Sequence, residues 1–148
     1  MKLQQGAFIK STELLNDTYF ADATIFIKEY NAGGAVGVII NRPSGKTLNQ
    51  LQEFKNSIPY PLHSGGPVDT QHLFFLHRRT DIIYGGDKIT EEIYWGGNFN
   101  EAVAAINTGA LTSRDIKIFV GYCGWDTGEL QLEIKEGSWV FAAAGTVF

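Results

Sequence analysis

The sequence predicts an α+β fold, because strand-like and helix-like segments are mixed along it without a regular βαβ alternation. No internal repeat of fixed period appears, and no long Ser, Gly or Pro stretch marks a linker. The chain has 148 residues, of which 44% are hydrophobic and 19% are charged. This length and composition suit one domain spanning residues 1–148.

The first two strands are predicted as an antiparallel hairpin. Residues 24–30 are rich in β-branched and aromatic side chains, and residues 35–40 form a nearly unbroken apolar run. Between them, Asn31-Ala32-Gly33-Gly34 supplies turn-forming residues. Continuous apolarity indicates that both faces are covered, so we expect the second strand to lie inside the sheet.

Two helices are indicated by their start signals. Thr47 precedes apolar residues 48, 51 and 54, which would share one helical face, so a helix is predicted after Thr47. Asn98, with Glu101 three residues later, predicts a capping box at the start of a second helix. Gly109 is the expected stop of that helix.

The later part of the chain predicts three further strands and one ambiguous segment. The strands are residues 72–77, 116–120 and 138–142. After residue 125, the apolar positions 130, 132 and 134 alternate as in a strand, whereas Asp126 followed by Glu129 offers a helix cap. We choose the helix for this segment.

The charge balance argues against nucleic-acid binding. Twelve basic and sixteen acidic residues give a net charge of −4, which opposes neutralisation of several phosphates along a duplex. The densest basic spots are Arg78-Arg79 and the pair Arg42 with Lys46. Spots of this size are predicted to be ordinary solvated surface.

A cytoplasmic protein without a membrane segment, metal or cofactor is expected. The N-terminus lacks an apolar leader, and no run of about 18 apolar residues is present. Cys123 is the single cysteine, and His72 and His77 would point to opposite faces of an extended strand, so no metal ligand set is apparent. The segment Gly45-Lys46-Thr47 lacks the glycine that a phosphate loop requires five positions earlier.

Four blocks of glycine, polar and aromatic residues follow apolar runs and mark the candidate site. They are Asn41-Arg42-Pro43-Ser44-Gly45, Ser64-Gly65-Gly66-Pro67-Val68, Leu76-His77 and Gly121-Tyr122-Cys123-Gly124-Trp125. Function tends to sit on loops that a scaffold holds, so we expect these blocks to meet around one hollow. The candidate ligand-binding residues are Asn41, Arg42, Gly65, Gly66, His77, Tyr122, Cys123 and Trp125.

Each candidate also has a structural interpretation. Turn chemistry alone explains Asn41 and Arg42 as braces, although Arg42 is also suited to hold a small anion. A single histidine at a strand end, such as His77, is more often hydrogen-bonded structure than a general base. Cys123 is more readily explained as a buried residue than as a reactive thiol. For the two aromatic residues beside it, a core role and a pocket role are equally open.

In this order, the blocks resemble the AlgH/YqgE family of bacterial proteins. The match also includes Glu29-Tyr30-Asn31, Gly128-x-Leu130 and Trp139, and it covers most of the chain. The resemblance implies a mixed, largely antiparallel, bifurcated sheet that curls into a pseudo-barrel with a few short helices. It implies no established catalytic residues, and family members are often labelled transcriptional regulators or left uncharacterised.

The favoured function is therefore a non-enzymatic, cytoplasmic module that binds a small molecule or a protein partner through the glycine blocks. One alternative is a hydrolytic or thiol-dependent enzyme that uses His77 with Cys123 or with a carboxylate. Another alternative is a transcriptional regulator that touches DNA directly. The sequence holds no arrangement of nucleophile, base and metal ligands that would name a reaction.

Overall fold

The computed structural model describes residues 1–148, and its mixture of strands and short helices confirms the predicted α+β class. The strands are β1 (Phe8–Ser11), β2 (Thr24–Asn31), β3 (Gly34–Ile39), β4 (Pro43–Thr47), β5 (Pro61–Ser64), β6 (Val68–His77), β7 (Asp87–Lys88), β8 (Tyr94–Trp95), β9 (Ile116–Asp126) and β10 (Trp139–Ala142). The helices are α1 (Phe99–Thr108) and α2 (Glu129–Lys135).

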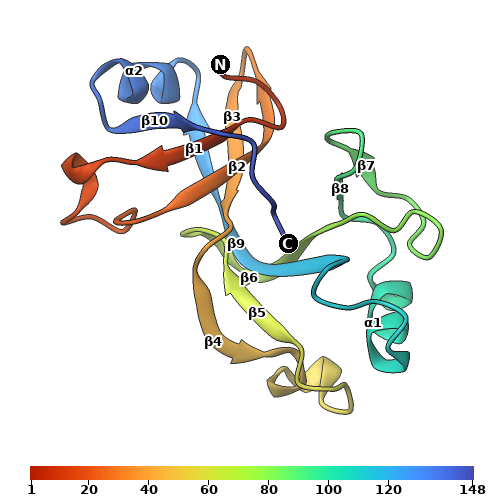
Figure 1. The fold of residues 1–148 in the computed structure, drawn as a ribbon. Helices are drawn as coiled ribbons and strands as arrows, with labels where there is room; N and C mark the ends of the chain where they lie inside the picture. The colour runs from red at the N-terminus through yellow and green to blue at the C-terminus, as the bar shows by residue number, and fades with distance from the viewer.

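The sheet divides along β9, the long strand that runs through both halves of the molecule (Figure 1). Its main path is β10-β1-β2-β3-β9-β6-β8-β7, while β5 pairs with β9 and carries β4 at its outer side. Only the β5–β9 pair is parallel. The start of β9 lies between β5 and β6, and its end pairs with β3. The predicted bifurcated, largely antiparallel and curled sheet is confirmed.

The predicted hairpin is confirmed as β2 and β3. Asn31 pairs with Gly34, and the Asn31 side chain accepts a hydrogen bond from the Gly33 N–H at 2.8 Å. An asparagine that bonds the backbone two residues ahead stabilises such a turn. Since β3 lies between β2 and β9, its position inside the sheet is also confirmed.

Helix α1 starts and stops where the sequence indicated. The Asn98 side chain accepts a hydrogen bond from the Glu101 N–H at 3.0 Å, and Gly109 ends the helix at a φ of +83°. The other half of the capping box is absent, because the Glu101 carboxylate accepts from the Tyr84 N–H at 3.0 Å. Helix α2 and the last strand, β10, also form, but the predicted cap at Asp126 is wrong, because Gly128 precedes the first helical residue and no side chain caps it.

The predicted helix after Thr47 is wrong. Residues 43–47 form strand β4, and two single 3₁₀ turns follow, at residues 48–50 and 52–54. Leu51 between them is extended, with a φ of −84° and a ψ of 134°. The expected apolar side still packs, because Leu48, Leu51 and Phe54 all contact one core cluster. Burial of these side chains fixed the spacing without requiring a continuous helix.

Strand β9 is longer than predicted and contains the block Gly121–Trp125 that was expected to follow the strand. Side chains alternate along this part of β9, with Cys123 and Trp125 buried and Gly124 exposed. The block therefore belongs to the centre of the sheet, where β9 leaves β6 and joins β3.

Three apolar clusters form the core. One lies beneath α1 and includes residues of β5 and the start of β9. A second joins β1, β2 and β3 to α2 and Trp139 of β10. A third contains residues from both halves of the sheet, among them Phe26, Leu76 and Phe119. The first two clusters therefore belong to separate halves of the sheet, and the third connects them.

Candidate functional site

The predicted glycine residues do lie together, at the point where the sheet divides. Gly65 and Gly66 connect β5 to β6 and cross Gly121 of β9, whose φ is +74°. A β-carbon added to any of the three would collide with the backbone of the crossing segment. Only glycine permits two backbones to approach so closely. Backbone atoms therefore occupy the space where a ligand was expected.

Cys123 is fully buried beside this glycine crossing. Its Sγ lies 3.4 Å from the Gly65 carbonyl oxygen. Burial raises the pKa of the Cys123 thiol to about 12, although the nearby Arg42 opposes part of the shift. Because the thiolate is the reactive form, this cysteine is an inert core residue in the folded chain.

Asn41 and Arg42 brace the loop that leads into β2. Asn41 accepts a hydrogen bond from the Thr24 N–H and donates one to the Asp22 carbonyl, both at 2.9 Å. The Arg42 guanidinium donates to the carbonyls of Tyr19 and Ala21 at 2.8 and 2.9 Å. These contacts engage both side chains with backbone groups, which is the bracing interpretation rather than an anion contact.

His77 lies at the far end of β9 from Cys123. It pairs with Ile116 of β9, which precedes Cys123 by seven residues. At about 3.3 Å per residue, Ile116 and Cys123 are roughly 20 Å apart along the strand. Its Nδ1 accepts from the Arg79 N–H at 3.1 Å, so Nε2 carries the proton and donates to the Gly96 carbonyl at 3.0 Å. Burial lowers the pKa of His77. The histidine is thus neutral, fully hydrogen-bonded and unable to act on Cys123.

Tyr122 and Trp125 point to different parts of the core. Tyr122 packs edge-on against Phe74, with ring centroids 5.4 Å apart. Trp125 is buried, and its indole N–H donates to Glu133 of α2 at 3.1 Å. The eight predicted residues therefore occupy several environments, and none of them lines the hollows described below.

The largest surface hollow lies along the bulged strand β6. Two adjoining cavities of about 800 and 360 Å³ share Leu51, Gln71, His72 and Leu73, and together we call them the β6 groove. Half of the ten residues that line the larger cavity are apolar, namely Leu51, Phe54, Leu73, Phe75 and Phe99, and the others include Gln52 and Glu53. The smaller one is lined mainly by polar residues, among them Ser44, Lys46, Ser64, Thr70, Gln71 and His72.

A bulge in β6 forms one wall of the groove. Val68 pairs with Tyr122 and Leu73 with Val120, so β6 holds three more residues than β9 between these pairs. Asp69 takes up the turn with a φ of +51°, which is uncommon outside glycine. Its Oδ1 lies 2.6 Å from the Nδ1 of His72. The bulge thereby places a fixed, exposed polar segment above an apolar floor.

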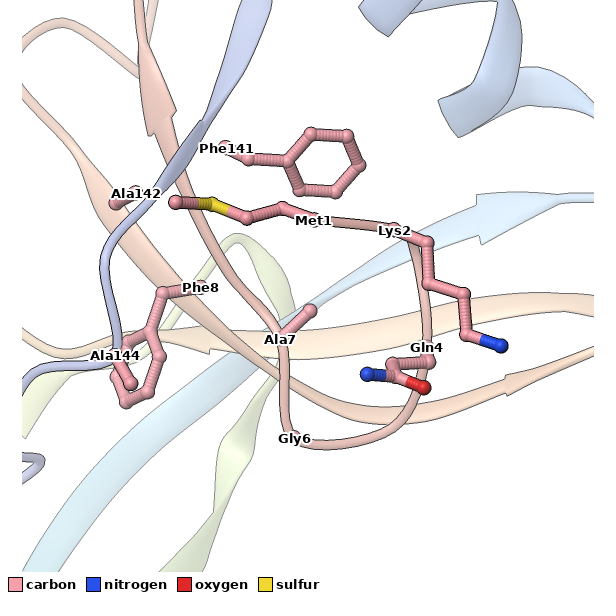
Figure 2. A pocket seen from close by; sticks show the side chains of 9 residues that line it. All are labelled: Met1, Lys2, Gln4, Gly6, Ala7, Phe8, Phe141, Ala142 and Ala144. Atoms are coloured by element: carbon pink, nitrogen blue, oxygen red, sulfur yellow. The ribbon is translucent and has the colours of Figure 1, made fainter.

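A separate hollow of about 200 Å³ lies where the N-terminal segment meets β10 (Figure 2). The Met1 side chain runs beside Ala142, and the Phe141 ring lies on the side opposite Gly6. Its lining is mostly apolar, with Lys2 and Gln4 as the polar side chains. This hollow offers fewer converging polar groups than the β6 groove.

Comparison with known proteins decides the family. The sequence model described as AlgH-like matches residues 8–148. The chain belongs to the AlgH-like family. A UPF0301 protein of Chlorobium phaeobacteroides is 37% identical over 143 residues, which cover 97% of this chain and 76% of that protein. A UPF0301 protein of Cytophaga hutchinsonii is 32% identical over 141 residues, covering 95% of this chain and 78% of that protein.

Solved structures agree with this assignment. The solution structure of the AlgH protein from Pseudomonas aeruginosa matches with a TM-score of 0.75 and 26% identity, covering 98% of this chain and 82% of that chain. A crystal structure of a Corynebacterium diphtheriae protein also gives a TM-score of 0.75, at 20% identity, and covers 96% of this chain and 76% of that chain. The latter supports a shared fold alone.

The basic spot Arg78-Arg79 of this AlgH-like chain is engaged in local contacts. Arg79 pairs with Asp81 at 2.8 Å and lies 3.7 Å from Asp115, while Arg78 stacks over the ring of Phe148.

Neither α-helix has the length and apolar character that a membrane-spanning helix needs. No group of three or more His, Cys, Asp or Glu side chains gathers as a metal site would require.

Sequence reasoning reached only the edge of the groove in this AlgH-like fold, because Ser44 and Ser64 of the glycine blocks line its smaller cavity while the eight predicted ligand-binding residues do not. Thr70, Gln71 and His72 carry no recognised motif, and their only signal is a polar run directly before the apolar end of β6. The partners across the groove, Leu51, Phe54 and Phe99, come from distant segments. Only the folded chain places them opposite one another.

Proposed function

We propose that this AlgH-like chain is a non-enzymatic binding protein that takes a small organic ligand in the β6 groove. The main support for the proposal is the bulge of β6. It holds Asp69 in a left-handed backbone conformation and places the exposed pair of His72 and Asp69 at the edge of the hollow. Bulges commonly re-aim side chains beside functional sites, and strained backbone positions concentrate there.

The shape and chemistry of the groove favour a small molecule. Its larger cavity, about 800 Å³, lies within the roughly 300–1,000 Å³ typical of ligand pockets. Aromatic side chains line the larger cavity, hydroxyl groups line the smaller one, and the amide of Gln71 and the imidazole of His72 line both. Glu53 adds a carboxylate to the larger cavity and Lys46 an ammonium group to the smaller one. A ligand with a flat apolar body and a hydrogen-bonding group at one end would complement both parts.

The available reactive groups favour binding over catalysis. The Cys123 thiol is buried and protonated, and His77 makes two backbone hydrogen bonds. In the groove, the Nδ1 of His72 faces Asp69, but no hydroxyl or thiol is hydrogen-bonded to the opposite ring nitrogen. The groove thus lacks the nucleophile–base contact that defines a catalytic triad.

A fragment library screened by ¹H–¹⁵N NMR tests the proposal. We expect fragments with an aromatic ring and an amide or carboxyl group to shift the backbone signals of Gln71, His72 and Leu73. Leu73→Arg, which places a long charged side chain in the groove, should abolish these shifts. The exposed variant Val140→Arg, on β10, should bind fragments as the wild type does.

Three results would overturn the proposal. The first is the absence of any hit at the groove. The second is a set of hits centred on Tyr122 and Trp125, which would place the ligand at the glycine blocks. The third is turnover of an activated ester such as p-nitrophenyl acetate that disappears in His72→Ala, which would make the groove catalytic.

A further inference from the structure

A second cavity lies on the opposite face of β5 from the β6 groove. Alternate residues of a strand point to opposite faces, so Leu62 and Ser64 face the groove while Pro61 and His63 face this cavity. His63 pairs with Phe119 of the parallel strand β9, and Lys117 is two residues before Phe119 on the same face. His63 and Lys117 are therefore diagonal neighbours within reach of each other.

Lys117 is a half-buried cation without an acidic partner. Its ammonium group donates to the Ile40 carbonyl at 2.6 Å and to the Val147 carbonyl at 2.9 Å, and it makes no salt bridge. Burial lowers the pKa of Lys117, because the charged form loses hydration. An ammonium group has three N–H donors, so one remains after the two carbonyls are satisfied.

His63 adds a second basic group to the same cavity. Its Nδ1 is buried and has no hydrogen-bond partner. Burial and then the neighbouring Lys117 lower the pKa of His63, and the backbone of Ile118 offsets part of that effect. Buried polar atoms almost always have a partner, so an orphaned ring nitrogen calls for an explanation.

The other groups around the cavity do not balance this charge. The Tyr60 hydroxyl donates to the Ile116 carbonyl, and its pKa is raised to about 12 by burial and by Asp115. The Asp115 carboxylate is itself held by the Thr112 N–H at 2.9 Å and by Arg79 at 3.7 Å. Two basic side chains thus share a partly buried site whose lining includes no Asp or Glu side chain, and Phe148, the last residue, lines the same site.

We propose that Lys117 and His63 bind a small oxyanion, a phosphate or a short carboxylate, in this cavity. A buried cation is stabilised by a paired anion, and an oxyanion in the cavity would accept the third N–H of Lys117 and pair with the positive charge of a protonated His63 ring. The cavity measures about 210 Å³, which is smaller than the roughly 300 Å³ at which pockets for drug-sized ligands begin. The site is independent of the function proposed for the β6 groove.

The test is an NMR titration of the His63 ring in the full chain, with sodium phosphate, sodium acetate or sodium chloride at matched ionic strength. Since proton and anion binding are reciprocally linked, an anion that prefers protonated His63 tenfold raises its midpoint by about one pH unit. We expect such a rise, saturable and confined to residues near the cavity, with phosphate or acetate. The more effective of the two identifies the oxyanion.

Two variants and one control complete the test. Lys117→Gln, which retains an amide donor for the neighbouring carbonyls, should weaken anion binding at least about tenfold, and His63→Asn should also weaken it. Lys10→Gln, at an exposed position of β1 away from both cavities, should bind as the wild type does. If chloride has the same effect as phosphate and acetate, or if both cavity variants bind normally, Lys117 is only a brace for Ile40 and Val147 and the proposal fails.

Discussion

Replacing Glu133 by alanine should destabilise the half of the molecule that contains α2. One oxygen of this carboxylate accepts hydrogen bonds from the indole N–H groups of Trp139, at 2.9 Å, and Trp125, at 3.1 Å. Both rings are buried, with 1% and 7% of their surfaces exposed, and they meet edge to face at 6.1 Å. The carboxylate therefore connects α2 to β9 and to β10 at once.

The magnitude follows from these two contacts. A hydrogen bond to a charged group contributes about 1.5–3 kcal/mol, and an unpaired buried donor costs about 1–3 kcal/mol. Because Glu133 is itself half-buried, water can reach part of the gap, and we expect Glu133→Ala to lower the free energy of unfolding by about 2–4 kcal/mol. Glu133→Gln keeps an acceptor oxygen, so its cost should be about 1 kcal/mol.

Urea denaturation followed by far-ultraviolet circular dichroism measures these losses without relying on tryptophan fluorescence. The matched control is Glu136→Ala, at the exposed end of the same helix, which should change the free energy of unfolding by less than about 0.5 kcal/mol. If Glu133→Ala is no more destabilising than Glu136→Ala, the two indole hydrogen bonds do not hold α2 in place.

Two further predictions concern the glycine crossing and His77. Gly121→Ala and Gly45→Ala both place alanine at a left-handed φ, +74° and +78°, but only the first adds a collision, with the backbone of Gly66. In urea denaturation Gly121→Ala should therefore be the more destabilising by at least about 2 kcal/mol, and equal losses would contradict the close crossing. Burial lowers the pKa of His77, so the unfolded chain binds more protons just below the ordinary pKa of about 6.5. The free energy of unfolding should thus fall as pH is lowered from about 7.5 to 5.5, less steeply in His77→Gln, and parallel curves would refute this assignment.

The elements that the sequence predicted correctly are those with local signals. The β2–β3 hairpin depends on a turn whose asparagine bonds its own backbone, and α1 depends on Asn98 and Gly109 at its ends. Each signal acts within a few residues, so it can be recognised without the rest of the fold. The helix predicted after Thr47 was wrong for the opposite reason. The spacing of its apolar residues reflects their packing against a core cluster formed by distant segments, not a continuous helix.

The candidate site was harder to predict, because its residues were chosen for their type and not for their surroundings. Arg42 and His77 have the side chains of a binding site, but two N–H groups of Arg42 and both ring nitrogens of His77 bond to backbone partners. Conversely, Gln71 and His72 belong to no motif and face the largest groove. Which polar group remains free depends on contacts between segments far apart in the chain.

The sequence by itself determined the α+β class, the family and the central strand pair, because turn residues, caps and unbroken apolar runs act locally. The tertiary structure alone decided that Gly65, Gly66 and Gly121 make a close crossing without a cavity. It also decided that the two faces of β5 carry two different hollows. The physical reason is that a cavity is the space left between side chains from several segments, and no single segment encodes it.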